Sequence, residues 1–155
     1  GYPFHHIHAT GSFGWEWMPE LVEKDGVDLP HTPSIDMREY IYDMPVEMAA
    51  ADVVISRSGA ATCNEIAASG TPSILIPSPN VTNNHQEHNA RVLSNKDAAV
   101  TILEKDCTAQ GIFDELQALL RDSARRENMS KTLRTMARLD STERICDIVE
   151  ELTKG

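Results

Sequence analysis

The sequence has few cysteines, and none of them are clustered. Its three cysteines, Cys63, Cys107 and Cys146, lie far apart and form no CxxC motif. This pattern argues against a disulfide framework and a cysteine-based zinc site, and it fits a reducing compartment. The sequence also lacks a run of about 18 apolar residues and any signal-peptide pattern, so we expect no membrane-spanning helix.

Basic residues are in the minority. The 14 Lys and Arg residues face 24 Asp and Glu residues, which gives a formal net charge of −10. A basic face that neutralises phosphates is therefore not expected, which argues against nucleic-acid binding and against holding an anionic membrane surface. Backbone N–H groups can still bind an anionic ligand, so a nucleotide remains compatible with this charge.

Short apolar runs rich in β-branched residues alternate with helical patterns, and the length fits one domain, residues 1–155. The predicted strands are residues 4–10, 52–57, 72–79 and 99–106. Residues 37–44 are predicted as a strand and its exit loop, with Tyr40-Ile41-Tyr42 just after the strand. The predicted helices are residues 15–26, 45–51, 61–69, 84–98, 108–122, 124–139 and 141–155. This alternation predicts an α/β fold, a Rossmann-like doubly wound parallel sheet with helices on both faces.

Two of the C-terminal helical patterns carry an apolar stripe at helical spacing. The first stripe comprises Ile112, Leu116, Leu119 and Leu120. The second comprises Ile145, Ile148, Val149 and Leu152.

The tripeptide Arg57-Ser58-Gly59 follows a predicted buried strand. Ligands of doubly wound sheets bind beyond the carboxyl ends of the strands. Gly59 would allow the backbone to come close to a ligand, and the free N–H groups of the next helix could bind an anion. The alternative is a tight strand-to-helix turn in which Ser58 caps the helix.

Glu65 is a single carboxylate in a helix of small residues. A carboxylate at this position could accept two hydrogen bonds from a ribose diol. The alternative is an ordinary solvated charge on a helix surface.

Amide and imidazole side chains gather in NVTNNHQEHNA, residues 80–90. These groups suit sugar hydroxyls, which present both donors and acceptors. The alternative is a polar loop with helix capping, in which Asn83 and Gln86 form a capping box.

Two histidine pairs have spacings that could serve a metal ion. They are His85 and His88, three apart on a predicted helix, and His6 and His8, on one face of a predicted strand. No further ligand at a suitable spacing completes a site, so we predict no metal. Cys63, near a helix start, could have a lowered pKa, but no base accompanies it, and we interpret it as a small packed residue.

Taken in order, these segments resemble a known family. ADVVISRSGAATCNEIAASGTPSILIPSP followed by NNHQEHNARVL is similar to the C-terminal domain of the MurG family. Those bacterial enzymes add N-acetylglucosamine to lipid I in peptidoglycan synthesis. The resemblance extends from about His8 to the C-terminus and is strongest over residues 40–93. It implies a GT-B glycosyltransferase with two Rossmann-like domains around a cleft, of which the C-terminal one binds UDP-N-acetylglucosamine.

The resemblance implies contacts to the nucleotide. Glu65 would bind the ribose hydroxyls of UDP. The backbone of Ile41 would contact uracil, with Tyr40 packing nearby. The diphosphate would lie at the start of the next helix, near Ser58, Gly59, Ala60 and Ala61.

The sugar would be held by the second polar segment. Gln86 would bind sugar hydroxyls. His85 stands where the family often has another Gln and would also contact the sugar, and Asn89 matches a family Asn in the same helix. Arg57 matches a family arginine to which we assign no contact. The resemblance implies no metal and no cofactor.

The sequence starts at GYPFHH, without Met and without the strand, GGSxGA-like loop and helix that open the family's domain. We therefore expect a fragment whose first βα unit is missing. The partner would be the family's N-terminal domain, with the lipid I site, the membrane-facing patch and the general base. The whole enzyme would be peripheral, on the cytoplasmic side of the bacterial membrane.

Two alternatives remain at this point. The chain could be the donor-binding subunit of a split GT-B glycosyltransferase. It could also be a non-catalytic nucleotide-binding α/β module. A receiver module would need an early acidic pair and an Asp at the end of a central strand, where this chain has Ser56-Arg57-Ser58.

Overall fold

The computed structural model describes residues 4–154. Contacts along the chain group into two compact units, Gly1–Met44 and Pro45–Gly155. In both units the strands are parallel, and helices or turns connect them. The predicted parallel α/β fold is therefore confirmed, with two strands in the first unit and three in the second.

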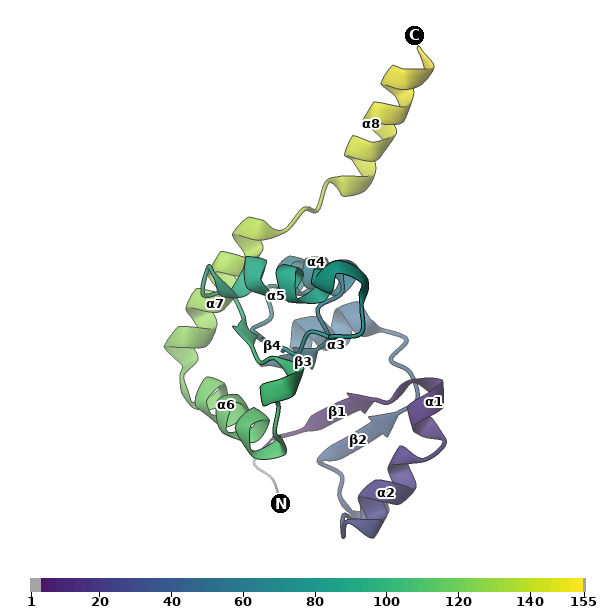
Figure 1. Cartoon of the computed structure of the whole chain (residues 1–155), viewed down its shortest axis with the longest axis vertical. Helices are drawn as coiled ribbons and strands as arrows, with labels where there is room; N and C mark the ends of the chain where they lie inside the picture. Colours follow the sequence, from purple (N-terminus) through teal and green to yellow (C-terminus); the bar gives the residue numbers. More distant parts are fainter. Residues whose placement is uncertain (1–3, 155) are drawn as a thin grey trace. The chain divides into compact units, whose positions relative to one another are not determined.

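The first unit is built on one parallel strand pair (Figure 1). Its elements are β1 (His6–Ala9), α1 (Gly11–Trp15), α2 (Met18–Lys24), η1 (Leu29–His31) and β2 (Ile35–Arg38). His6 lies opposite Ile35 in the register. Pro19 lies in the first turn of α2, so the predicted helix over residues 15–26 starts late, at Met18.

Residues 37–44 form the end of a strand and its exit loop, as predicted, although the strand starts two residues earlier, at Ile35. β2 ends at Arg38, and Tyr40-Ile41-Tyr42 forms the loop that follows. Both tyrosines are exposed and the isoleucine is buried, so the alternation typical of a strand belongs here to a loop anchored by one side chain. The next helix begins at Met44, with Pro45 in its first turn, and this leaves no room for a longer strand.

The second unit has a three-stranded parallel sheet in the order β3-β4-β5. The remaining elements are α3 (Met44–Ala50), β3 (Val54–Ser56), α4 (Ala60–Ser69), β4 (Ser73–Leu75), η2 (Thr82–Asn84), α5 (His85–Ser94), β5 (Val100–Thr101), η3 (Glu104–Asp106), α6 (Ala109–Arg121), α7 (Ser123–Met136) and α8 (Ser141–Thr153). In the central register Ile74 lies opposite both Ile55 and Val100.

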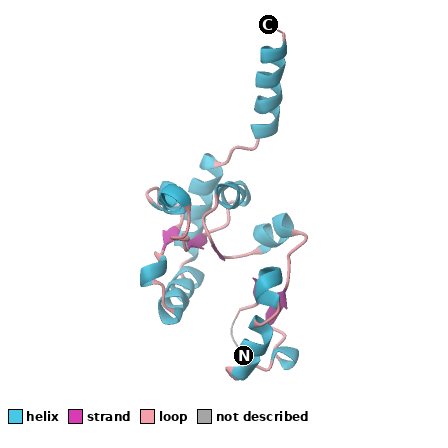
Figure 2. Ribbon diagram, turned by 45° about the vertical axis from the view of Figure 1, so that its right-hand side comes forward, coloured by secondary structure: helices cyan, strands magenta, loops and turns pink. Residues whose placement is uncertain are grey.

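Helices cover both faces of this sheet. Figure 1 shows α4 and α5 on one side of the strands and α6 on the other, and Figure 2 shows the magenta strands enclosed by helices. The core joins Ile74 of the central strand to Leu119 of α6 and Met129 of α7. The apolar stripe predicted on α6 therefore packs against the sheet through Leu119, which has no exposed surface.

The predicted end of α4 is confirmed, and the predicted start of α5 is not. α4 ends at Gly70 as predicted, with φ of 71° in the left-handed region. The predicted capping box of Asn83 and Gln86 is wrong, because Asn83 and Asn84 both adopt left-handed backbone and no side chain caps α5. Asparagine tolerates this conformation better than most residues, which is why two can stand in sequence here.

The described part of α8 is exposed along its whole length. Each of the four side chains in its predicted apolar stripe is more than half exposed: Ile145, Ile148, Val149 and Leu152. Within residues 4–154, none of the helices combines the length and the apolar character that crossing a bilayer requires.

Candidate functional site

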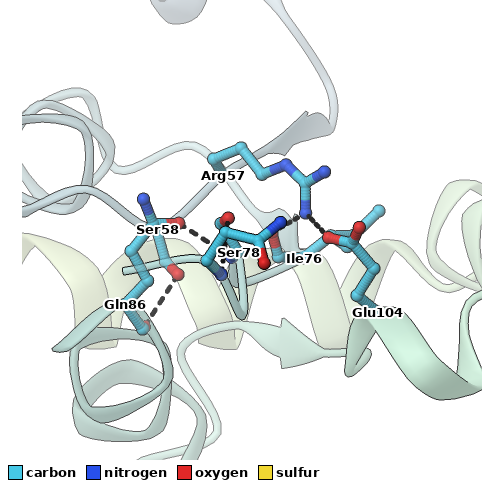
Figure 3. A network of polar contacts seen from close by, with 7 residues as sticks. Arg57, Ser58, Ile76, Ser78, Gln86 and Glu104 are labelled. Carbon is cyan, nitrogen blue, oxygen red and sulfur yellow. Dashed lines mark hydrogen bonds and ion pairs between the residues drawn. The ribbon is translucent and has the colours of Figure 1, made fainter. Parts of the chain in front are cut away.

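The turn between β3 and α4 is held from inside the protein. Ser58 has no exposed surface, and its Oγ donates a hydrogen bond to the carbonyl oxygen of Gln86 at 2.8 Å (Figure 3). The residue that caps α4 is Gly59, without a side-chain hydrogen bond, so the alternative in which Ser58 caps this helix is wrong. What this turn can offer a ligand is its backbone and the free N–H groups of the first turn of α4.

Gly59 leaves open space at this turn. Its φ of −60° is available to any residue. A methyl group at this position would meet Thr62 Oγ1 at 3.8 Å, an ordinary van der Waals contact. Packing among the described residues therefore does not require glycine here, whereas a closely approaching ligand would.

α5 is tied to this turn and to the loop after β4. Asn89 donates through Nδ2 to the carbonyl oxygen of Ser58 at 3.0 Å. Gln86 accepts through Oε1 from the backbone N–H of Ser78 at 2.9 Å (Figure 3). That oxygen accepts one hydrogen bond here, and the Nε2 amide group, which has no acceptor within residues 4–154, can donate to a ligand. Nothing in the sequence indicated the role of Ser78.

The exposed part of α4 carries Ala60, Ala61 and Glu65. Ala61 and Glu65 are four residues apart and share one face of the helix. Within residues 4–154, no cation pairs with the Glu65 carboxylate. Small side chains at the helix start and one free acidic group a turn later form a surface that a hydroxyl-bearing anion could approach.

His85, at the start of α5, is exposed and oriented by its own loop. Its Nδ1 lies 2.9 Å from the carbonyl oxygen of Thr82. A carbonyl only accepts, so Nδ1 carries a proton and Nε2 of the neutral ring is an acceptor. Next to it, Asn84 donates to the Glu87 carboxylate at 2.6 Å. This bond, together with one from Arg91, lowers the pKa of Glu87.

Arg57 links the ends of two strands. Its Nη1 donates to the carbonyl oxygen of Ile76, just after β4, at 3.2 Å. The same guanidinium forms an ion pair with Glu104 in η3 (Figure 3). Sequence reasoning assigned Arg57 no contact and did not single out Glu104, which lies 47 residues away.

Tyr40 and Ile41 belong to the first unit. Ile41 is buried, with 8% of its surface exposed, and anchors the loop after β2. Tyr40 is 62% exposed, and its ring packs edge-to-face on Tyr42 with centroids 5.1 Å apart. The loop thus holds one side chain inside and offers its aromatic rings to the surface.

The remaining candidate residues serve packing. Burial raises the pKa of the Cys63 thiol, which agrees with a packed residue and not with an activated one. His6 and His8 pack their rings edge-to-face, 5.5 Å apart. In the part of the chain that the structure describes, no three His, Cys, Asp or Glu residues come together as metal ligands would.

The profile of the glycosyltransferase family 28 C-terminal domain matches residues 1–145. The chain belongs to this family. The relatives and the solved MurG structure that follow confirm the predicted resemblance to the MurG family. A UDP-N-acetylglucosamine–N-acetylmuramyl-(pentapeptide) pyrophosphoryl-undecaprenol N-acetylglucosamine transferase of Acetivibrio thermocellus is 40% identical over 98% of this chain. The enzyme of the same name from Desulforamulus reducens is 38% identical over 94% of it.

Solved structures agree with this assignment. The crystal structure of Acinetobacter baumannii MurG superposes with a TM-score of 0.78 at 25% identity, covering 94% of this chain and 42% of that one. The glycosyltransferase VinC shares the fold, with a TM-score of 0.65 at 19% identity over 88% of this chain and 33% of its own. The chain spans about 40% of the length of the Acetivibrio relative.

Proposed function

We propose that this chain is the donor-binding domain of an N-acetylglucosaminyltransferase that transfers N-acetylglucosamine from UDP-N-acetylglucosamine to lipid I. The names of its relatives supply the substrate class. The observation that carries the proposal is the free, exposed carboxylate of Glu65 on α4, one helical turn beyond the small residues at the helix start. A ribose diol offers the two donors that such a carboxylate can accept.

In this proposal the donor lies across the starts of α4 and α5. The diphosphate approaches Gly59, Ala60 and Ala61, where free N–H groups and the positive end of the helix dipole favour negative charge. The side-chain amide of Gln86 and the imidazole ring of His85 contact sugar hydroxyls.

The uracil contact belongs to the other unit. The backbone of Ile41 would bind the base, with Tyr40 beside it. This contact stays a prediction.

The chemistry would be a displacement. A hydroxyl of the acceptor attacks the anomeric carbon of the donor sugar, and UDP leaves with the bonding electron pair. This domain would hold the donor and stabilise the charge that develops on the leaving diphosphate, because fixed helix dipoles need no reorganisation at that moment. The proposal invokes no metal and no cofactor.

The acceptor and the general base would lie in the part of the relatives that this chain does not cover. That part would also provide contact with the cytoplasmic face of the bacterial membrane, where the whole enzyme would be peripheral. The isolated chain should then bind UDP weakly and catalyse no transfer. Transfer to a lipid I analogue by the isolated chain would contradict this division of roles.

The test is the affinity for UDP after Glu65→Ala, measured by calorimetry. We expect binding to weaken by about 1.5–3 kcal/mol, the range for a hydrogen bond to a charged group. Glu143→Ala, on the exposed surface of α8, is the matched control and should leave the affinity unchanged. Unchanged UDP affinity in a folded Glu65→Ala protein would refute the proposed site.

A further inference from the structure

Three hydrogen bonds join α5 to the two loops that precede α4 and α5. They are Ser58 Oγ to the Gln86 carbonyl at 2.8 Å, Asn89 Nδ2 to the Ser58 carbonyl at 3.0 Å, and the Ser78 N–H to Gln86 Oε1 at 2.9 Å. The first two bridge 28 and 31 positions of sequence. We call the residue pair Ser58 and Asn89, with these two bonds, the clamp.

Water cannot easily replace the hydrogen bonds of the clamp. Ser58 is fully buried, so no water can replace a lost partner of its hydroxyl without a rearrangement of the turn. Asn89 is partly buried in the middle of α5, where its amide meets the Ser58 carbonyl from the side. The turn before α4 is therefore fixed twice, through the hydroxyl of Ser58 and through its backbone carbonyl.

The two helices carry different parts of the proposed site. Glu65 lies on α4, which starts directly after the clamped turn, and the side-chain amide of Gln86 lies on α5. A ligand that contacts both side chains needs a fixed distance between these helices. A ligand that contacts α4 alone does not.

We infer that Ser58 and Asn89 are positioning residues, which hold α4 and α5 in the arrangement that a nucleotide sugar requires, and that Asn89 acts through Ser58 instead of touching the ligand. This inference rests on the proposed function. It replaces the expectation from sequence that both residues bind the donor directly.

The experiment compares UMP with UDP-N-acetylglucosamine by calorimetry on the whole chain. In Asn89→Ala, affinity for UDP-N-acetylglucosamine should fall about tenfold, while affinity for UMP changes less than about twofold. A merely structural role would lower both affinities equally, through the folded fraction. Alanine favours the helix, so α5 itself should persist. The matched control is Asn95→Ala at the other end of α5, which should change neither affinity.

A double-mutant cycle separates positioning from direct contact. Ser58→Ala removes the other half of the clamp and should show the same selective loss. The double variant should lose less than the product of the two single losses, because both bonds hold one turn. If the losses multiply, or if Ser58→Ala leaves UDP-N-acetylglucosamine binding intact, the inference is overturned.

Folding of each variant is checked by urea unfolding. If Asn89→Ala does not fold, Asn89→Gln is measured instead, and the same selective loss is expected because the extra methylene displaces the amide. Equal losses for both ligands in a folded variant would overturn the inference alone. A wild-type chain that binds neither ligand would overturn the proposed function and this inference together.

Discussion

Arg57 and Glu104 form an ion pair that connects the end of β3 to the segment after β5. Because Arg57 also donates to the Ile76 carbonyl, one guanidinium joins the chain segments that follow all three strands of the second unit. The side chains of Arg57 and Glu104 are 53% and 41% exposed. Water and salt therefore screen the pair, and its energetic contribution should be small although its geometric role is central.

Replacing Glu104 by Gln should lower the free energy of unfolding by less than about 1 kcal/mol, the usual range for an exposed pair. The difference from wild type should shrink further at high salt. Urea unfolding at low and high ionic strength measures both effects. Arg57→Met should cost more, because it also leaves the Ile76 carbonyl without its donor, and equal losses for the two variants would contradict this account.

Gly70→Ala should destabilise the second unit by about 1–2 kcal/mol, since an L-residue pays this amount in left-handed backbone. Gly70 has φ of 71°, and a methyl group there would come within 2.6 Å of Arg134 Nε. Thermal or urea unfolding gives the loss. Adding Arg134→Ala to the Gly70→Ala variant should restore only the part of the lost stability that comes from the clash with Arg134. Complete restoration would show that the left-handed backbone is not the main cause of the loss.

The stability of the first unit should fall as the pH drops through about 6.5. Partial burial, and then His8 and His5, lower the pKa of folded His6 from its usual 6.5. The unfolded chain therefore takes up its proton first, and it binds more protons than the folded chain over that window. Below the folded pKa the loss levels off.

This pH dependence can be followed through tryptophan fluorescence, because Trp15 and Trp17 both lie in the first unit. His6→Gln removes the titrating group and should flatten the dependence on pH between neutral and mildly acidic conditions. An unchanged slope in this variant would show that His6 is not responsible.

Cys63 should react with thiol reagents more slowly than Cys146 at pH near 8. Burial raises the pKa of Cys63, so less thiolate is present, and Cys146 lies exposed on α8. Mass spectrometry after timed alkylation measures the order of modification. Cys146→Ser should remove the fast phase, and rapid labelling of Cys63 in that variant would contradict its packed position.

Element order was predictable from sequence because each buried strand is a short apolar run between turn residues. For example, the strand β4 (Ser73–Leu75) is fully buried and lies inside the predicted strand 72–79. Tyr40-Ile41-Tyr42 follows β2 as predicted, whereas the start of that strand, Ile35, lies two residues before the predicted segment. The local pattern does not fix where this strand starts, since the pairing of Ile35 with His6 on the neighbouring strand decides it.

For the candidate site, the sequence predicts which segments take part but not the hydrogen bonds within them. Glu65 was singled out because it stands alone among small residues, and it is exposed in the structure. Ser58 and Asn89 were expected to face a ligand. Instead Ser58 donates to the Gln86 carbonyl in α5, and Asn89 donates to the Ser58 carbonyl in the turn before α4, across 28 and 31 positions. Such partners depend on how the loops pack. The family resemblance points to Ser58 and Asn89, but only the structure shows that their polar groups are already hydrogen-bonded within the protein.

The exposed stripe of α8 has a consequence for how the chain holds together. A helix of this length is marginal in water unless one face is covered, since nucleation is costly and each added residue gains little. α8 buries none of its described residues, so its order depends on its own backbone hydrogen bonds. In this chain it should therefore fray and re-form independently of the core, and the cooperative unit that melts as one ends with α7.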